Sequence, residues 1–188
     1  FKLAYTLNDT TSIYGGVSTG YKATAWNISR DSLPDATEIA ALALAGTPVG
    51  PNTGVGRRYA DPEESEVLEV GAKIKLPTGY LNIALFDQKI EGFQSNTFIG
   101  TGFILANAGS QSTKGYEFDL VMSPTDSIDL AISGLFMDPI YDSFPNSSSG
   151  DLTGTMPSNV SENTVSSTIT WNWNCLLYTS DAADEWWG

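Results

Sequence analysis

The sequence predicts an all-β fold, in which antiparallel, up-and-down strands form a fragment of a transmembrane β-barrel. Three observations support this prediction. Apolar and polar residues alternate along most of the chain, short and long connections follow one another in turn, and charged residues recur in mid-strand opposite the apolar stripe. Barrels of outer membranes share these patterns, because their strands present one face to lipid and the other to the barrel interior.

Strict alternation is the signal of a strand with two unlike faces. In "EVLEVGAKIKL" (66–76), Leu68 and Val70 share one face, whereas Glu69 and Lys73 share the other. Such segments predict about seven strands, too few to close on themselves because membrane barrels begin at about eight. The predicted strands lie within residues 1–8, 13–22, 67–76, 81–86, 116–122, 128–136 and 165–173.

The lengths of the connections separate a barrel from other all-β folds. The short connections, rich in residues that suit tight turns, are 8–11, 77–79 and 123–127. The long connections are 23–62, 92–103 and 139–162. Because short and long connections alternate, all the long ones lie at the same end of the sheet. A membrane barrel has this arrangement, with short periplasmic turns and long external loops.

Composition excludes several classes of function. The 188 residues carry a formal net charge of −13, which argues against nucleic acid as a partner. Histidine is absent and Cys175 is the single cysteine. A histidine-based catalytic triad and the usual zinc sites are therefore excluded, and we expect neither a metal nor a cofactor. Glu117 and Asp119 share a strand face but no predicted cleft, so we do not expect an enzyme such as a glycosidase.

Four consecutive segments resemble TonB-dependent outer-membrane receptors. They are "VSTGYKATAWN" (17–27), "DPEESEVLEVGAKIK" (61–75), "GYLNIALFDQKIEGFQ" (79–94) and "NAGSQSTKGYEFDL" (107–120). Each segment is a weak match taken singly, but their order and spacing follow the family's pattern across about residues 1–174.

The resemblance implies a plugged barrel of about 22 strands in the bacterial outer membrane, of which this chain is a late-middle part. Such a receptor transports a scarce nutrient, here a ferric siderophore or similar iron complex, with cobalamin or an oligosaccharide as other small-molecule substrates. Its implied partners are outer-membrane lipid and TonB, which acts through a plug domain absent from this chain.

The end of the chain departs from the pattern. "CLLYTSDAADE" (175–185) matches no strand period and resembles a translated sequencing adapter. We therefore predict two regions, part of a receptor barrel over 1–174 and a non-native tail over 175–188. Ordinary divergence or a loop insertion is the alternative. The chain also begins at Phe1 without methionine, which suggests a fragment or a processed product.

Two external loops offer candidate substrate contacts. Arg57, Arg58 and Tyr59 lie in the longest loop, and an arginine pair suits a carboxylate or catecholate ligand. A solvated loop, or a contact with lipopolysaccharide phosphates, would explain these residues equally. In the next long loop, aromatic and amide groups together suit sugars and many siderophores, although packing of the loop on itself is the alternative. The candidates there are Phe93, Gln94, Asn96 and Phe98.

Charged residues in mid-strand are expected to face the lumen or the plug. They are Glu69, Lys73, Lys75, Glu117 and Asp119. In a β-sandwich the same residues would face bulk solvent, so a secreted or surface β-sandwich that binds a ligand without transporting it remains the alternative to a transport receptor.

Overall fold

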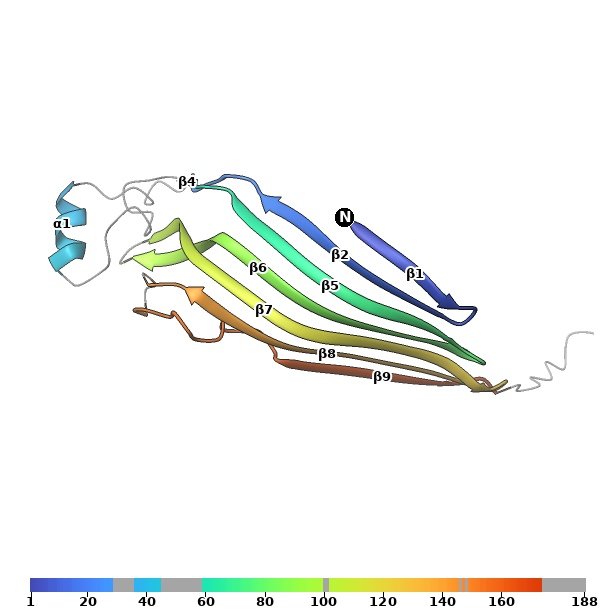
Figure 1. Cartoon of the computed structure of the whole chain (residues 1–188). Helices are drawn as coiled ribbons and strands as arrows, with labels where there is room; N and C mark the ends of the chain where they lie inside the picture. Colours follow the sequence, from blue (N-terminus) through green and yellow to red (C-terminus); the bar gives the residue numbers. More distant parts are fainter. Residues whose placement is uncertain (29–35, 45–58, 100–101, 146, 148, 174–188) are drawn as a thin grey trace, which may run out of the picture.

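The computed structural model describes residues 1–28, 36–44, 59–99, 102–145, 147 and 149–173. Seven of the described strands form one antiparallel sheet in which neighbours follow chain order, an up-and-down arrangement (Figure 1). In spatial order they are β1 (Lys2–Asn8), β2 (Thr11–Lys22), β5 (Glu63–Leu76), β6 (Gly79–Ile99), β7 (Gly102–Thr125), β8 (Ile128–Ser143) and β9 (Asn163–Trp171). This confirms the predicted fold class.

The short turns at 9–10, 77–78 and 126–127 occupy one end of the sheet, and the long connections after β2 and β8 lie at the other end (Figure 1). At the short end, backbone hydrogen bonds join turns to the neighbouring strands, from Lys75 N of β5 to Thr10 O at 2.7 Å and from Ser123 N of β7 to Thr78 O at 2.8 Å. The long connection after β2 contains α1 (Ala36–Leu44) and a two-stranded ribbon of β3 (Ala25–Trp26) and β4 (Tyr59–Ala60). No helix among the described residues is long and apolar enough to cross a membrane.

Three strands, β6, β7 and β8, extend well beyond their predicted ends. We expected a loop over 92–103, but β6 and β7 stay paired out to Ile99 and Gly102. The register shifts between Glu91 and Gln94, where Gly92 adopts a φ of 63°. Such a bulge adds a residue to one strand and interrupts the period of two, so alternation ends there although backbone pairing continues.

β8 likewise continues through Pro139, which we expected to begin a loop. Met137 N and Tyr141 N, two residues to either side, donate to Glu162 O and Thr155 O in the connection between β8 and β9. The nitrogen of Pro139 lies between these bonds and pairs with no strand there, because β9 ends its pairing at Phe136. Proline is tolerated where no ladder hydrogen bond is required of it.

The sheet has an apolar face and a polar face, defined by alternate residues. The register aligns Val70 with Leu85, Leu85 with Tyr116, and Tyr116 with Phe136, which makes a continuous apolar row. Val70, Leu85 and Tyr116 of this row are exposed, Leu85 to 55%, and Phe136 is half-buried. Soluble monomers rarely expose contiguous apolar surface on this scale. The apolar face therefore requires a covering, as lipid would provide.

Gly71 lies on the polar face, opposite Tyr14 of β2, and a side chain at this position tests the packing of the Tyr14 ring. A Cβ there would lie 2.5 Å from Tyr14 Cζ and 2.7 Å from Ile83 O, closer than packed atoms allow. We expect Gly71→Ala to lower the free energy of unfolding by about 1–3 kcal/mol, the usual cost of overpacking. Urea unfolding of the protein in detergent micelles measures it.

Gly15→Ala on the adjacent strand is the matched control. Its added Cβ would meet Val70 Cγ1 at 3.4 Å, an ordinary contact, so no loss of stability is expected. Equal stability of the two variants would show that the Tyr14 ring does not pack over Gly71.

Candidate functional site

The predicted lumen-facing residues all lie on the polar face. The register places Glu69 opposite Phe86, Lys73 opposite Asn82, and Glu117 opposite Ala84. Lys2 joins them from β1, with its Nζ 3.8 Å from Glu69 Oε1 and 3.9 Å from the centre of the Tyr14 ring. Because the Lys2 side chain is 61% exposed, this ion pair contributes little to stability.

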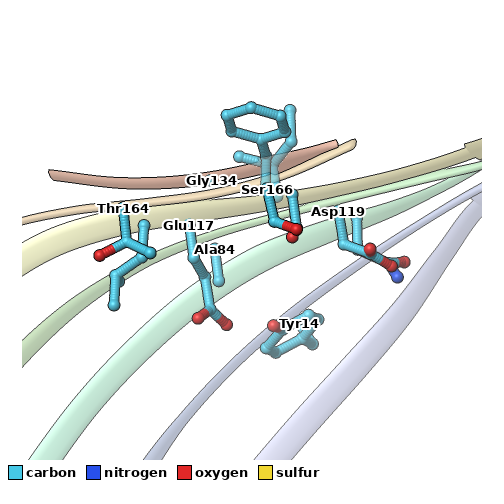
Figure 2. A pocket seen from close by; sticks show the side chains of 12 residues that line it. Tyr14, Ala84, Glu117, Asp119, Gly134, Thr164 and Ser166 are labelled. Carbon is cyan, nitrogen blue, oxygen red and sulfur yellow. The ribbon is translucent and has the colours of Figure 1, made fainter. Parts of the chain in front are cut away.

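A hollow of about 280 Å³ lies in the middle of the polar face, and we name it the central hollow. Small side chains, among them those of Ala84 and Ser166, leave space above this face of the sheet. Figure 2 shows Glu117 and Asp119 projecting from the sheet toward Tyr14. Within the described residues no group of three or more potential metal ligands comes together. The central hollow is a small recess lined by both apolar and polar groups.

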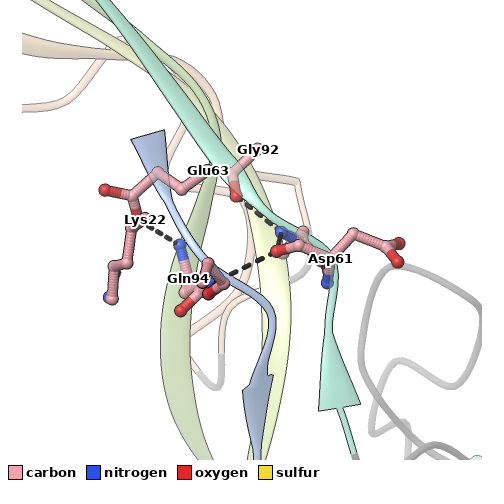
Figure 3. Close-up of polar contacts among 7 residues, drawn as sticks. Lys22, Asp61, Glu63, Gly92 and Gln94 are labelled. Carbon is pink, nitrogen blue, oxygen red and sulfur yellow. Dashed lines mark hydrogen bonds and ion pairs between the residues drawn. The ribbon is translucent and has the colours of Figure 1, made fainter. Parts of the chain in front are cut away.

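A network of hydrogen bonds, the rim network, joins the sheet to its longest connection at the external end (Figure 3). The Asn107 amide donates to Asp61 O at 2.9 Å and to Gly92 O at 2.6 Å, and its Oδ1 accepts from Asp61 N at 2.7 Å. Glu63 accepts from Gln94 N at 2.8 Å and lies 3.7 Å from Lys22 Nζ. These bonds fix the bulge between β6 and β7.

Gln94, a predicted substrate contact, belongs to the rim network. Its Nε2 donates to Ala23 O at 2.9 Å and to Asp61 O at 3.0 Å, so both amide hydrogens have partners within the protein. Asn96 is exposed farther along β6. Contact of Gln94 or Asn96 with substrate stays a prediction.

Phe93, another predicted contact, packs in an aromatic cluster with Tyr141 and Phe144. Its ring stacks on Tyr141 at a centroid distance of 5.4 Å and meets Phe144 edge-on at 5.3 Å. Phe144 is only 6% exposed, so the cluster anchors the β8–β9 connection to β6. Phe93 therefore has a packing role, and its contact with substrate is untested.

The remaining candidates are only partly described. Tyr59 lies on β4, where its ring is 5.1 Å from that of Trp26. Phe98 is part of β6. Arg57 and Arg58 fall outside the described residues.

Sequence reasoning did not single out Asn107 and Asp61 of the rim network as site residues, although Asn107 begins one of the segments that carry the family resemblance. Its partner Asp61 lies 46 residues away in sequence. The segment "DPIYDSF" (138–144) could line the external vestibule on sequence grounds, and the structure packs its Tyr141 and Phe144 rings against Phe93.

A sequence model of the family described as TonB dependent receptor-like, beta-barrel matches residues 1–187. The chain belongs to this family. The match agrees with the single sheet, its apolar face and its one-ended loops. The barrels of these receptors lie in the outer membrane, where barrel strands present an apolar face to lipid and alternate side chains to the barrel interior.

Solved structures of siderophore receptors share the fold. The ferric yersiniabactin uptake receptor FyuA from Yersinia pestis is 20% identical, with a TM-score of 0.62 over 89% of this chain and 22% of that chain. The ferric preacinetobactin receptor BauA from Acinetobacter baumannii is 16% identical, with a TM-score of 0.58 over 90% of this chain and 22% of that chain.

The alcaligin outer membrane receptor FauA from Bordetella pertussis is 13% identical, with a TM-score of 0.55 over 94% of this chain and 26% of that chain. The chain thus spans between 22% and 26% of the length of these receptors. No curated protein sequence matches it.

The rim network predicts the effect of Asn107→Ala in the intact receptor. The change removes three hydrogen bonds, each contributing about 0.5–1.5 kcal/mol. We expect backbone amides of residues 93–96 to exchange with deuterium about tenfold faster or more, because the bulge is no longer held to Asp61. Asn163→Ala, at an exposed position on β9, is the control. Unchanged exchange in Asn107→Ala would contradict a structural role for the network.

Proposed function

We propose that the chain is a section of a receptor that carries a ferric siderophore or similar iron complex across the outer membrane, energised through TonB. Membership of the receptor family is the observation that carries this proposal. Solved receptors for ferric yersiniabactin and ferric preacinetobactin share the fold, which favours an iron complex over cobalamin or an oligosaccharide.

In this proposal the external loops capture the substrate and no bond is made or broken, so the protein is not an enzyme. Contacts would come from Arg57, Arg58, Tyr59, Phe93, Gln94, Asn96 and Phe98. Glu69, Lys73, Lys75, Glu117 and Asp119 would face the lumen and a plug domain outside this chain. Movement of the plug, driven by TonB, would release the substrate inward.

A β-sandwich binding module was the alternative. A sandwich needs a second sheet packed on the apolar face to form a core. Within the described residues the seven-stranded sheet is a single layer, and of the buried hydrophobic residues only Ala84 and Ala108 belong to it, whereas Ala60 lies on β4 and Phe144 in the β8–β9 connection. These observations favour the barrel. The division into barrel residues 1–174 and a non-native tail 175–188 remains our proposal, and the tail lies outside the described residues.

Iron-limited growth tests the transport function. The intact receptor would be expressed in a bacterial strain that lacks its own siderophore receptors, with a panel of iron-loaded siderophores as the sole iron source. We expect growth on at least one of them, and loss of that growth when the tonB gene is deleted. Growth that survives loss of TonB, or no iron-dependent growth on any chelate, would contradict the proposal.

A further inference from the structure

A second hollow on the polar face, the outer hollow, lies nearer the external end than the central one. Its volume is about 440 Å³, within the range of about 300–1,000 Å³ typical of small-molecule sites. The wall consists of polar-face residues from four neighbouring strands, β5 to β8, and the β8–β9 connection supplies the remaining side through Pro157 and Val160. The hollow is therefore an open recess between the sheet and this connection.

The connection over 144–162 is held to the sheet by its own hydrogen bonds. Tyr141 N donates to Thr155 O at 2.9 Å, and Gly154 N donates to Tyr141 O at 2.8 Å. Pro157 is buried. Hydrogen bonds from the Thr153 side chain and backbone also lower the pKa of the exposed Asp151 carboxyl in the same connection. A wall that is already in place when a ligand arrives reduces the entropy lost on binding.

The lining combines apolar surface with hydrogen-bonding groups. Apolar side chains include Phe86 and Met137, and the neutral polar groups are those of Gln88, Gln111 and Thr113. An apolar lining with a few convergent polar groups is the usual composition of a site for a small organic molecule.

The charges in the lining are of one sign. Glu69 and Glu117 are its only ionisable side chains among the described residues, and no lysine or arginine contributes. Glu69 Oε1 forms an ion pair with Lys2 Nζ at 3.8 Å. Glu117 has no ion pair among the described residues. A ligand in the outer hollow therefore meets a negative potential, which repels anions and attracts cations.

We propose that the outer hollow is a substrate subsite that selects neutral or positively charged iron chelates, such as those of hydroxamate type, over polyanionic tris-catecholate chelates. The inference rests on the proposed transport function and narrows its substrate class. The chelate's apolar and amide parts contact the Phe86 and Gln111 side of the hollow, and any positive group lies toward Glu117.

Binding of three iron(III) chelates to the purified intact receptor in detergent tests the inference. The probes are a cationic linear tris-hydroxamate, a neutral cyclic tris-hydroxamate and a triply anionic tris-catecholate, each titrated while quenching of tryptophan fluorescence is followed. We expect one of the hydroxamate chelates to bind at least about tenfold more tightly than the catecholate, which corresponds to about 1.4 kcal/mol.

Two variants of adjacent residues on β7 locate the site. Thr113→Trp fills the hollow, whereas Lys114→Trp places the same bulk on the opposite face, where the Lys114 side chain is 73% exposed. We expect Thr113→Trp to raise the dissociation constant of the preferred chelate about tenfold, and Lys114→Trp to leave it unchanged. Gln111→Leu, which removes an amide without adding bulk, gives a second test if Thr113→Trp fails to fold.

The outcomes separate this inference from the proposed function. Tightest binding of the catecholate, or full affinity in both Thr113→Trp and Gln111→Leu, would overturn the subsite and its charge preference while leaving iron uptake intact. Failure of the wild-type receptor to bind or transport any iron chelate would overturn both.

Discussion

The sheet must present apolar side chains to lipid on one face and polar side chains to water on the other. The register of its strands makes this possible. Val70, Leu85, Tyr116 and Phe136 align on four neighbouring strands, so that each apolar residue lies beside another. Backbone groups pair between strands throughout this region, because lipid offers them no water as an alternative hydrogen-bond partner. A slip of one residue at any pairing would turn a whole strand's apolar side chains inward and its charges toward lipid.

Toward the external end, hydrogen bonds and aromatic packing hold the chain in place, and the alternation of apolar and polar residues no longer does so. The rim network holds the bulge at Gly92, and the aromatic cluster around Phe144 holds the β8–β9 connection against the sheet. The outer hollow lies between the sheet and this connection, with polar-face residues of β5 to β8 on one side and Pro157 and Val160 on the other.

The sequence was sufficient to predict the strands in the membrane, their faces and the turns between them, because lipid on one side forces a period of two. The sequence did not predict the structure beyond the lipid-covered part of the strands, where no period of two is imposed. The extension of β6 to Ile99 and of β8 past Pro139 depends on backbone pairing, which leaves little trace in side-chain pattern. Gln94 illustrates the same limit at the site, since its partners Ala23 and Asp61 are remote in sequence.

Spin labels along β6 of the intact receptor in lipid bilayers test most directly the claim that one face of the sheet contacts lipid and the other contacts water. Single cysteines from 81 to 86 would be introduced into a cysteine-free background and labelled, and their collisions with oxygen and with a water-soluble nickel chelate would be measured. The account predicts that odd-numbered positions collide with oxygen, which concentrates in lipid, and even-numbered positions with the nickel chelate. Equal access of the nickel chelate to both sets would contradict it.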